Sequence, residues 1–209
     1  MKKPRTPSAT LAAATATPAA HKGAGAIRII GGQWKRTQLR VVSHPGLRPT
    51  PDRVRETLFN WLGQNLTGWR CMDVFAGTGV LGFEAASRGA AAVTLLEQDS
   101  ALVAQLAAQQ QRLGATTVRV QRGDGIAALR QATPASLDLV LIDPPFEADL
   151  FLPALKAAGQ AVATDGYVYL EAPEAWTNEA LAPTGLQVYR HMKAGVVHAH
   201  LLRRSAGGE

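Results

Sequence analysis

An acidic residue, two prolines and an aromatic ring, Asp143-Pro144-Pro145-Phe146, follow the apolar run from Leu139 to Ile142. Such an unbroken apolar run favours a strand that is buried on both faces. Because proline cannot donate a hydrogen bond to a sheet, the strand must stop there. The spacing predicts a carboxylate, a stiff turn and a ring just past the carboxyl end of a parallel strand, where ligands bind in open α/β sheets. The alternative is a rigid loop with a solvated Asp and a core Phe.

A glycine-rich segment upstream could form a second site at the same edge. Gly77, Gly79 and Gly82 match the pattern G-x-G-x-x-G between an apolar strand and a helix, and Glu97 ends the next predicted strand. Glycines let the backbone approach a cofactor closely, and an acid at this distance accepts hydrogen bonds from ribose hydroxyls. This pattern alone fits a dinucleotide or another adenosine cofactor.

Two further carboxylates distinguish these cofactors. Asp73, beside the glycine loop, would repel a pyrophosphate but suits a cationic amino-acid group, and Asp124 could accept from an adenine amino group. S-adenosylmethionine has an ammonium, a ribose and an adenine but no phosphate, so the pattern favours it. The alternative is that each acid caps the following helix. The predicted cofactor-binding residues are Asp73, Phe75, Ala76, Gly77, Thr78, Gly79, Glu97, Gln98, Asp124 and Gly125.

Alternating strands and helices would position these residues. Apolar strand segments lie near 71–75, 92–96, 117–121, 137–142 and 166–170, and helical segments near 79–88, 99–113, 125–131 and 148–163. Asp99 is expected to cap the second of these helices and Gly114 to end it. The alternation predicts a parallel sheet with right-handed crossovers. Two strand-like runs, 186–192 and 196–202, predict a terminal hairpin with a turn at 193–195.

A basic extension, residues 27–66, precedes the predicted 67–205 domain. Two short strands at 27–30 and 39–42 flank a basic turn, and Thr50 is expected to cap a helix that has Pro51 at its first position. This extension could bind RNA phosphates and one stacked base, or could be a charged capping hairpin. The predicted RNA contacts are Trp34, Lys35, Arg36, Arg40, Arg48, Thr50 and Arg53, with Arg55 near the same helix start.

Composition supports a polyanion-binding arm on a globular body. The 209 residues are 46% hydrophobic and 18% charged, an ordinary soluble balance. Residues 1–55 hold eleven Lys/Arg against one acid, a charge of +10, whereas residues 56–209 hold eleven against fifteen, a charge of −4. Residues 1–26, rich in Ala, Thr and Pro, read as a disordered tail. The single Cys71 excludes an intrachain disulfide and a Cys-rich zinc module, and no apolar run approaches the roughly 18 residues of a membrane span. We expect a cytoplasmic monomer without a metal.

These motifs together resemble the class I S-adenosylmethionine-dependent methyltransferases, and the Asp-Pro-Pro-Phe box resembles their amino-group methylating branch. Two segments, Arg28-Ile29-Ile30-Gly31-Gly32-x-Trp34 and the run from Gly46 to Leu62, resemble the bacterial 16S ribosomal RNA guanine-N2 methyltransferase family. The similarity extends from about Ile27 to Arg204. It implies an α/β fold: a seven-stranded, mostly parallel Rossmann-like methyltransferase sheet with helices on both faces, a C-terminal antiparallel hairpin and a small N-terminal hairpin-and-helix extension.

The resemblance also implies a substrate and roles for the Asp-Pro-Pro-Phe box. The expected cofactor is S-adenosylmethionine, and the partner is 16S ribosomal RNA or the small ribosomal subunit. Asp143 and the Pro144 carbonyl would accept hydrogen bonds from the guanine N2 amine, Pro145 would stiffen the turn, and Phe146 would stack on the extruded base. The alternatives are a DNA adenine or cytosine amino methyltransferase and a non-catalytic RNA-binding or assembly protein with a relic cofactor pocket. A dinucleotide-dependent oxidoreductase leaves the Pro-Pro-Phe box unexplained.

Overall fold

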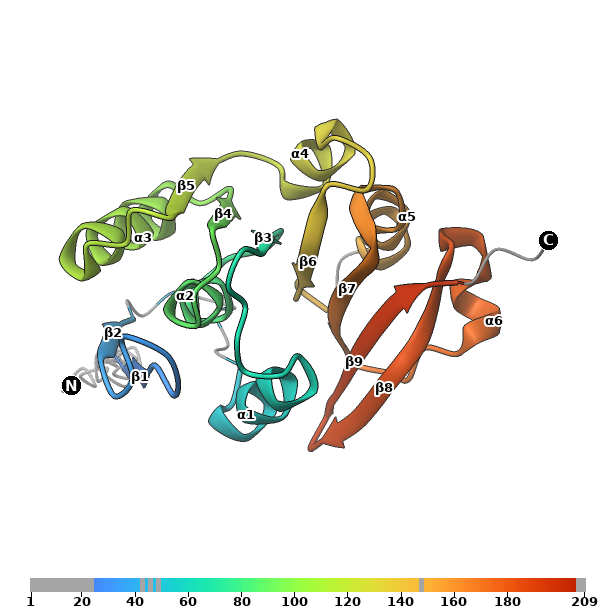
Figure 1. The fold of residues 1–209 in the computed structure, drawn as a ribbon, viewed down its shortest axis with the longest axis horizontal. Helices are drawn as coiled ribbons and strands as arrows, with labels where there is room; N and C mark the ends of the chain where they lie inside the picture. The colour runs from blue at the N-terminus through green and yellow to red at the C-terminus, as the bar shows by residue number, and fades with distance from the viewer. Residues whose placement is uncertain (1–24, 42–43, 45–46, 48–49, 147–148, 206–209) are drawn as a thin grey trace, which may run out of the picture.

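The computed structural model describes residues 25–41, 44, 47, 50–146 and 149–205. Its centre is a seven-stranded sheet in the order β5-β4-β3-β6-β7-β9-β8, and β1 and β2 form a separate two-stranded sheet. Strands β3 to β7 are parallel, whereas β9 runs antiparallel to both β7 and β8. Figure 1 shows the small sheet at the opposite end of the molecule from the β8–β9 hairpin. The fold class predicted from the sequence is therefore confirmed.

The helices and strands have the following bounds. The strands are β1 (Ala26–Arg28), β2 (Gln38–Arg40), β3 (Arg70–Asp73), β4 (Ala92–Glu97), β5 (Val118–Arg122), β6 (Leu137–Ile142), β7 (Val162–Ala172), β8 (Leu186–Ala194) and β9 (Val197–Arg204). The helices are α1 (Asp52–Trp61), α2 (Val80–Ser87), α3 (Ser100–Leu113), α4 (Gly125–Gln131), α5 (Phe151–Ala161), α6 (Asn178–Leu181) and the 3₁₀ turn η1 (Ala182–Thr184).

Two apolar cores cover the two faces of the sheet. Helices α1, α2 and α3 contribute to one core, and α4, α5 and α6 contribute to the other. Strand β6 belongs to both, because Leu139 and Leu141 face the first core while Val140 and Ile142 face the second. All four side chains are fully buried. This explains why the strand before the Asp-Pro-Pro-Phe box is apolar throughout instead of alternating.

A buried ion network fixes the basic extension to the sheet. Arg55 of α1 has no exposed side-chain area, and its Nη1 donates to Glu84 Oε1 of α2 at 2.7 Å and to the Arg28 carbonyl at 3.0 Å. Glu84 Oε1 also accepts from the Ile30 amide at 2.6 Å, and Glu84 Oε2 pairs with Arg88 at 3.3 Å. Burial raises the pKa of Glu84, whereas the Ile30 amide and the two guanidinium groups lower it. The extension is thus held by helix α2.

Several sequence-based boundaries were wrong. Thr50 does not cap α1: Pro51 holds the N-cap position with ψ 148, no side chain caps the helix, and Thr50 is buried. Strand β1 begins at Ala26, the last residue of the segment expected as a tail, and Ala26 pairs with Arg40. Residues 162 and 163, predicted as the end of the helix 148–163, belong to β7 instead, where Val162 pairs with Leu137. Apolar spacing cannot distinguish a short buried strand from a helix end.

Candidate active site

The carboxyl ends of β3, β4 and β6 surround a cavity of about 600 Å³. The strand order reverses between β3 and β6, so this is the switch point at which open α/β sheets bind ligands. Its volume is within the usual range for small-molecule sites. The cavity is lined by His44, Leu47, Thr50, Asp73, Val74, Phe75, Ala76, Gly77, Thr78, Val80, Leu81, Leu96, Glu97, Gln98, Asp99, Leu102, Gly123, Gly125, Asp143, Pro144, Pro145, Phe146 and Leu150.

Close packing explains two glycines of the loop that joins β3 to α2. Gly79, the N-cap residue of α2, has φ +76, and a Cβ there would lie 2.4 Å from the Leu106 side chain. A Cβ at Gly82 would lie 2.1 Å from Leu95. Gly79 therefore shapes the turn and Gly82 lets α2 pack directly on the sheet. Gly79 itself does not line the cavity.

Glu97 is held by three backbone amides. Its Oε2 accepts from Gly77 at 2.9 Å, and its Oε1 accepts from Gln98 at 2.8 Å and from Asp99 at 2.9 Å. These bonds join the end of β4 to the glycine loop and fix the half-buried carboxylate on the cavity wall. Oε1 already accepts two hydrogen bonds, but Oε2 can still accept a further one, as a ribose hydroxyl would require.

Asp73 lies at the end of β3 and is almost fully buried, with 2% of its area exposed. Its Oδ2 accepts from the Gly82 amide at 3.2 Å. Burial raises the pKa of Asp73 to about 7, and the nearby carboxylates of Glu97 and Glu171 also raise it. A buried carboxylate with acidic neighbours favours a cation as its partner. The arrangement fits the ammonium of an amino-acid group.

Asp124 has a structural role that the cofactor prediction did not require. Its Oδ1 accepts from the Ile126 amide at 2.8 Å and from the Ala127 amide at 3.2 Å, which caps α4. Its neighbours Gly123 and Gly125 line the cavity, whereas Asp124 is exposed and does not. Contact between Asp124 and an adenine stays a prediction.

The Asp-Pro-Pro-Phe box follows β6, and all four of its residues line the cavity. Asp143 is half-buried, Pro144 is buried and Pro145 is exposed. The Phe146 ring is half-buried and lies 6.3 Å from the Phe151 ring, tilted by 40°. The box thus presents a carboxylate and an aromatic ring to the same cavity as Asp73 and Glu97, as the shared sheet edge predicted.

Most of the predicted RNA contacts lie outside the cavity. Lys35, Arg36 and Arg40 are exposed on the β1–β2 unit, and Arg53 is exposed on α1. Trp34 is half-buried against the first core, so only part of its ring could meet a base. Among the described members of this group, only Thr50 lines the cavity. Arg48 lies outside the described residues, and Arg55 is engaged in the buried network instead of facing an anion.

Sequence reasoning missed three groups beside the cavity. His44 lines it and pairs with Asp99 at 3.5 Å, and Leu47 forms another part of its wall. Glu171, at the end of β7, is buried and accepts from the Tyr169 hydroxyl at 2.9 Å. Burial raises the pKa of the Tyr169 hydroxyl, and the carboxylates of Glu171 and Asp143 raise it further. Glu171 is therefore a second acid close to the same tyrosine as Asp143 of the box. A carboxylate ending the strand next to β6 was the signal that could have identified Glu171.

No helix in the described part of the chain is long and apolar enough to cross a membrane. The described residues also contain no group of three His, Cys, Asp or Glu side chains placed to hold a metal ion. Cys71 is a free, buried thiol whose pKa is raised to about 12 by burial and by Asp138, so it behaves as a small core residue.

Comparison with known proteins gives consistent matches over most of the chain. The family model described as "Conserved hypothetical protein 95" matches residues 27–203. Ribosomal RNA small subunit methyltransferase D from Escherichia coli is 41% identical over 192 residues, which cover 90% of this chain and 96% of the relative. The protein of the same name from Haemophilus influenzae is 37% identical over 179 residues, or 79% of this chain and 93% of the relative.

Solved structures agree with these sequence matches. One from Escherichia coli has a TM-score of 0.75 and 39% identity, and covers 88% of this chain and 100% of that chain. The structure of a ribosomal protein L11 methylase from Lactobacillus delbrueckii has a TM-score of 0.59 at 18% identity, covering 81% of this chain and 86% of that one, which shows a shared fold alone.

Proposed function

Since this chain belongs to the family described as "Conserved hypothetical protein 95", we propose that it transfers a methyl group from S-adenosylmethionine to the N2 amine of one guanine in 16S ribosomal RNA. The observation that carries the proposal is one cavity lined both by the cofactor residues Asp73, Gly77 and Glu97 and by the Asp-Pro-Pro-Phe box. Relatives up to 41% identical are named as small-subunit ribosomal RNA methyltransferases, which supports the substrate class.

The residues of the cavity fit the cofactor. Asp73 would hold its ammonium, Glu97 its ribose hydroxyls, and the backbone at Gly77 would allow close approach. When bound, the cofactor supplies an electrophilic methyl group. No step of the proposal requires a metal.

Within the box, Asp143 and Pro144 would prepare the amine. The guanine N2 lone pair is delocalised into the ring, so the amine is a weak nucleophile. The Asp143 carboxylate and the Pro144 carbonyl can each accept one of its hydrogens, which favours a pyramidal nitrogen with its lone pair directed at the methyl donor. Most of the rate enhancement would come from positioning and electrostatics. Asp143 could take the proton after transfer.

Phe146 would hold the base after it leaves its stack. Extruding a base costs a few kcal/mol, and stacking on an aromatic ring returns about 1–3 kcal/mol. The two contributions are comparable, so the ring can offset much of the cost. The half-buried Phe146 ring on the cavity wall supports this role.

Methyl incorporation from labelled cofactor tests the proposal. Four substrates are compared: protein-free 16S RNA, small ribosomal subunits, duplex DNA and free nucleotides. The expected product is N2-methylguanine in the RNA of one or both of the first two substrates. Label in DNA adenine or cytosine, or no transfer to any substrate by a preparation that binds S-adenosylhomocysteine, would contradict it.

A further inference from the structure

The terminal hairpin carries a charge opposite to that of the domain around it. Between Leu186 and Arg204 the sequence has four Lys/Arg and no acid, a charge of +4. The rest of residues 56–209 has seven Lys/Arg against fifteen acids, a charge of −8. A basic element within an acidic body is the electrostatic signature of contact with a polyanion.

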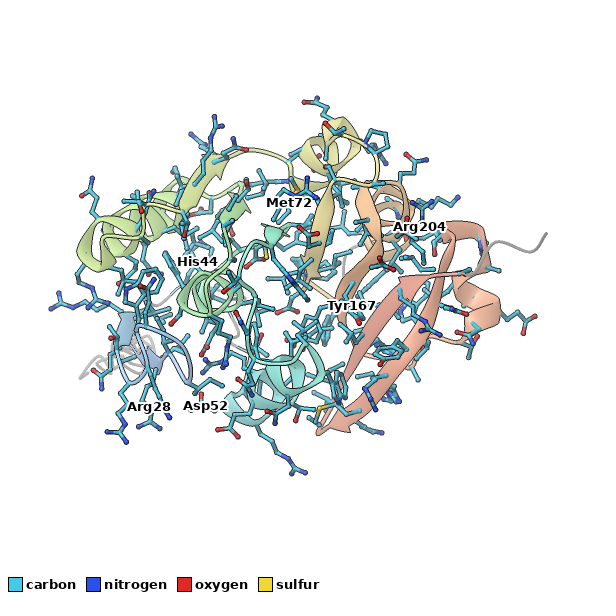
Figure 2. All side chains as sticks on the ribbon, in the orientation of Figure 1. Arg28, His44, Asp52, Met72, Tyr167 and Arg204 are labelled. Carbon is cyan, nitrogen blue, oxygen red and sulfur yellow. The ribbon has the colours of Figure 1, made fainter. Side chains whose placement is uncertain are left out.

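The hairpin forms one edge of the large sheet, where the Val188 amide of β8 donates to Asn178 Oδ1 of α6 at 2.8 Å. Strand β8 is the last strand in the sheet order, and Figure 1 shows α1 beside only the turn end of the hairpin. Met192 and Ala194, near that turn, pack against the first core. Figure 2 places Arg204 at the other end of the hairpin, away from α1. Tyr189, Arg190 and Arg203 are exposed on this outer part.

A stacking platform is already assembled there. A register shift between Val188 and Arg190 places Tyr189 in a bulge, where 38% of its area is exposed. The guanidinium carbons of Arg190 and Arg203 lie 5.2 Å and 5.0 Å from the Tyr189 ring centroid. Neither guanidinium is paired with a carboxylate of the described residues. Their N–H groups are therefore available to phosphate oxygens.

Two more rings extend this platform across the sheet. Tyr167 of β7 lies 5.8 Å from Tyr189, and Trp69, just before β3, stacks on Tyr167 at 6.1 Å. Both rings are half-buried and pack against the first core, so the contact with Tyr167 fixes the position of the exposed Tyr189 ring. Trp69 precedes the amino end of β3, whereas the cavity lies at the carboxyl ends. The platform is thus separate from the cofactor site.

We propose that the hairpin face formed by Tyr189, Arg190 and Arg203 is a second RNA-contacting surface, which binds phosphates through the two guanidinium groups and stacks one unpaired base on the tyrosine. Cationic side chains beside an exposed ring are the combination by which proteins bind single-stranded RNA. The RNA would be another segment of the substrate named above, so the identity of this RNA rests on the proposed function. The inference that the hairpin face contacts RNA rests on the platform itself and not on the proposed function.

The test compares two double variants with the same charge change. Arg190→Gln with Arg203→Gln removes the guanidinium groups of the platform, and Arg119→Gln with Arg130→Gln removes two exposed guanidinium groups elsewhere. Tyr189→Leu removes the ring alone. Kd values for protein-free 16S RNA and for small subunits are measured at several salt concentrations. Thermal melts and S-adenosylhomocysteine binding establish that each variant is folded.

The platform pair should lower the slope of log Kd against log salt by about two, one for each phosphate contact. Tyr189→Leu should raise the Kd for RNA by about fivefold or more with little change in slope. At saturating RNA, kcat should stay at the wild-type value, because none of these residues meets the cavity.

Equal slopes for the platform and control pairs, together with an unchanged Kd for Tyr189→Leu, would overturn the proposal. A loss of affinity for small subunits but not for protein-free RNA would also overturn it, since the surface would then contact a protein. If the wild-type chain transferred no methyl group, the proposed function would fail, yet these binding measurements would still decide the role of the hairpin.

Discussion

Asp143 and Phe146 contact different parts of the proposed substrate, so their variants should fail differently. Asp143→Ala should abolish turnover while S-adenosylhomocysteine binding stays near normal, because the carboxylate acts on the amine. Asp143→Asn keeps one acceptor oxygen and should retain some activity. Phe146→Ala should lower kcat/KM by about ten- to a hundredfold, the equivalent of about 1–3 kcal/mol of lost stacking, whereas Phe146→Tyr should be tolerated.

Single-turnover methylation and thermal melts on the same preparations separate these effects from loss of packing. Phe146 contacts Phe151, so some loss of stability is expected from Phe146→Ala. Full specific activity in a folded Asp143→Ala protein would end the proposed role of this carboxylate.

Asp73 should make cofactor affinity depend on pH. Because the pKa of Asp73 is about 7, its carboxyl group is largely protonated below pH 7 in the protein without cofactor. A bound ammonium favours the carboxylate and lowers this pKa, so binding must release a proton at low pH. The Kd for S-adenosylhomocysteine should fall by up to about tenfold per pH unit between pH 5 and 7 and level off above it. Calorimetry in buffers of different ionisation enthalpy measures the released proton.

The Asp73→Asn variant serves as control for this linkage. It should bind the cofactor weakly and without the pH dependence. The pKa of Asp73 is higher in the folded protein than in the unfolded chain, so ionisation of Asp73 destabilises the fold as the pH rises from the unfolded pKa to about 7. Above pH 7, Asp73→Asn should therefore be more stable than the wild type. Wild-type affinity that is constant from pH 5 to 8 would show that Asp73 does not meet the ammonium.

At the scale of elements, the contact between α1 and α2 depends on buried charge. Glu84→Gln would remove the buried carboxylate that Arg55 shares with Arg88 and leave Arg55 only the half-exposed Asp52 carboxylate at 2.5 Å. Breaking a buried ion pair costs about 3–5 kcal/mol in comparable sites. Glu56→Gln removes the same charge from an exposed position of α1 and should change stability by less than about 0.5 kcal/mol. Urea unfolding measures both. Equal stability of the two variants would mean that the network does not hold the extension.

The sequence predicted the helices, the strands and the sheet edge that holds the site better than it predicted which side chains contact each other in the folded chain. Strand β6 and the helix from Asp99 to Gly114 were identifiable because unbroken apolar runs and cap residues are local signals. The roles of Arg55 and Glu84 were not, because the burial of a charged pair depends on two segments that meet only in the folded chain. For the same reason, Asp124 could not be assigned to a helix cap rather than to a ligand from its spacing alone.

Over the whole molecule, positive charge lies at both ends of an acidic body. The β1–β2 unit presents Lys35, Arg36 and Arg40, and the β8–β9 hairpin carries its own basic residues. The cavity lining includes the acids Asp73, Glu97, Asp99 and Asp143 and no Lys or Arg of the described residues. Figure 1 shows the two basic units at opposite ends of the long axis. An RNA that contacts both would span the domain and present one base to the cavity. A larger share of the affinity should then come from folded basic surfaces than from residues 1–24.

This arrangement predicts how RNA affinity responds to salt. Arg36→Gln with Arg40→Gln should lower the slope of log Kd against log salt by about two, because each lost phosphate contact removes about one. Deleting residues 1–24, which leaves the β1 strand complete, should change the slope less, and Arg119→Gln with Arg130→Gln should leave it near the wild-type value. Filter binding to 16S RNA between about 50 and 200 mM salt covers the range in which such slopes are steep. If the deletion removes most of the slope and the Arg36 and Arg40 variants leave it unchanged, the tail and not the β1–β2 unit binds the RNA.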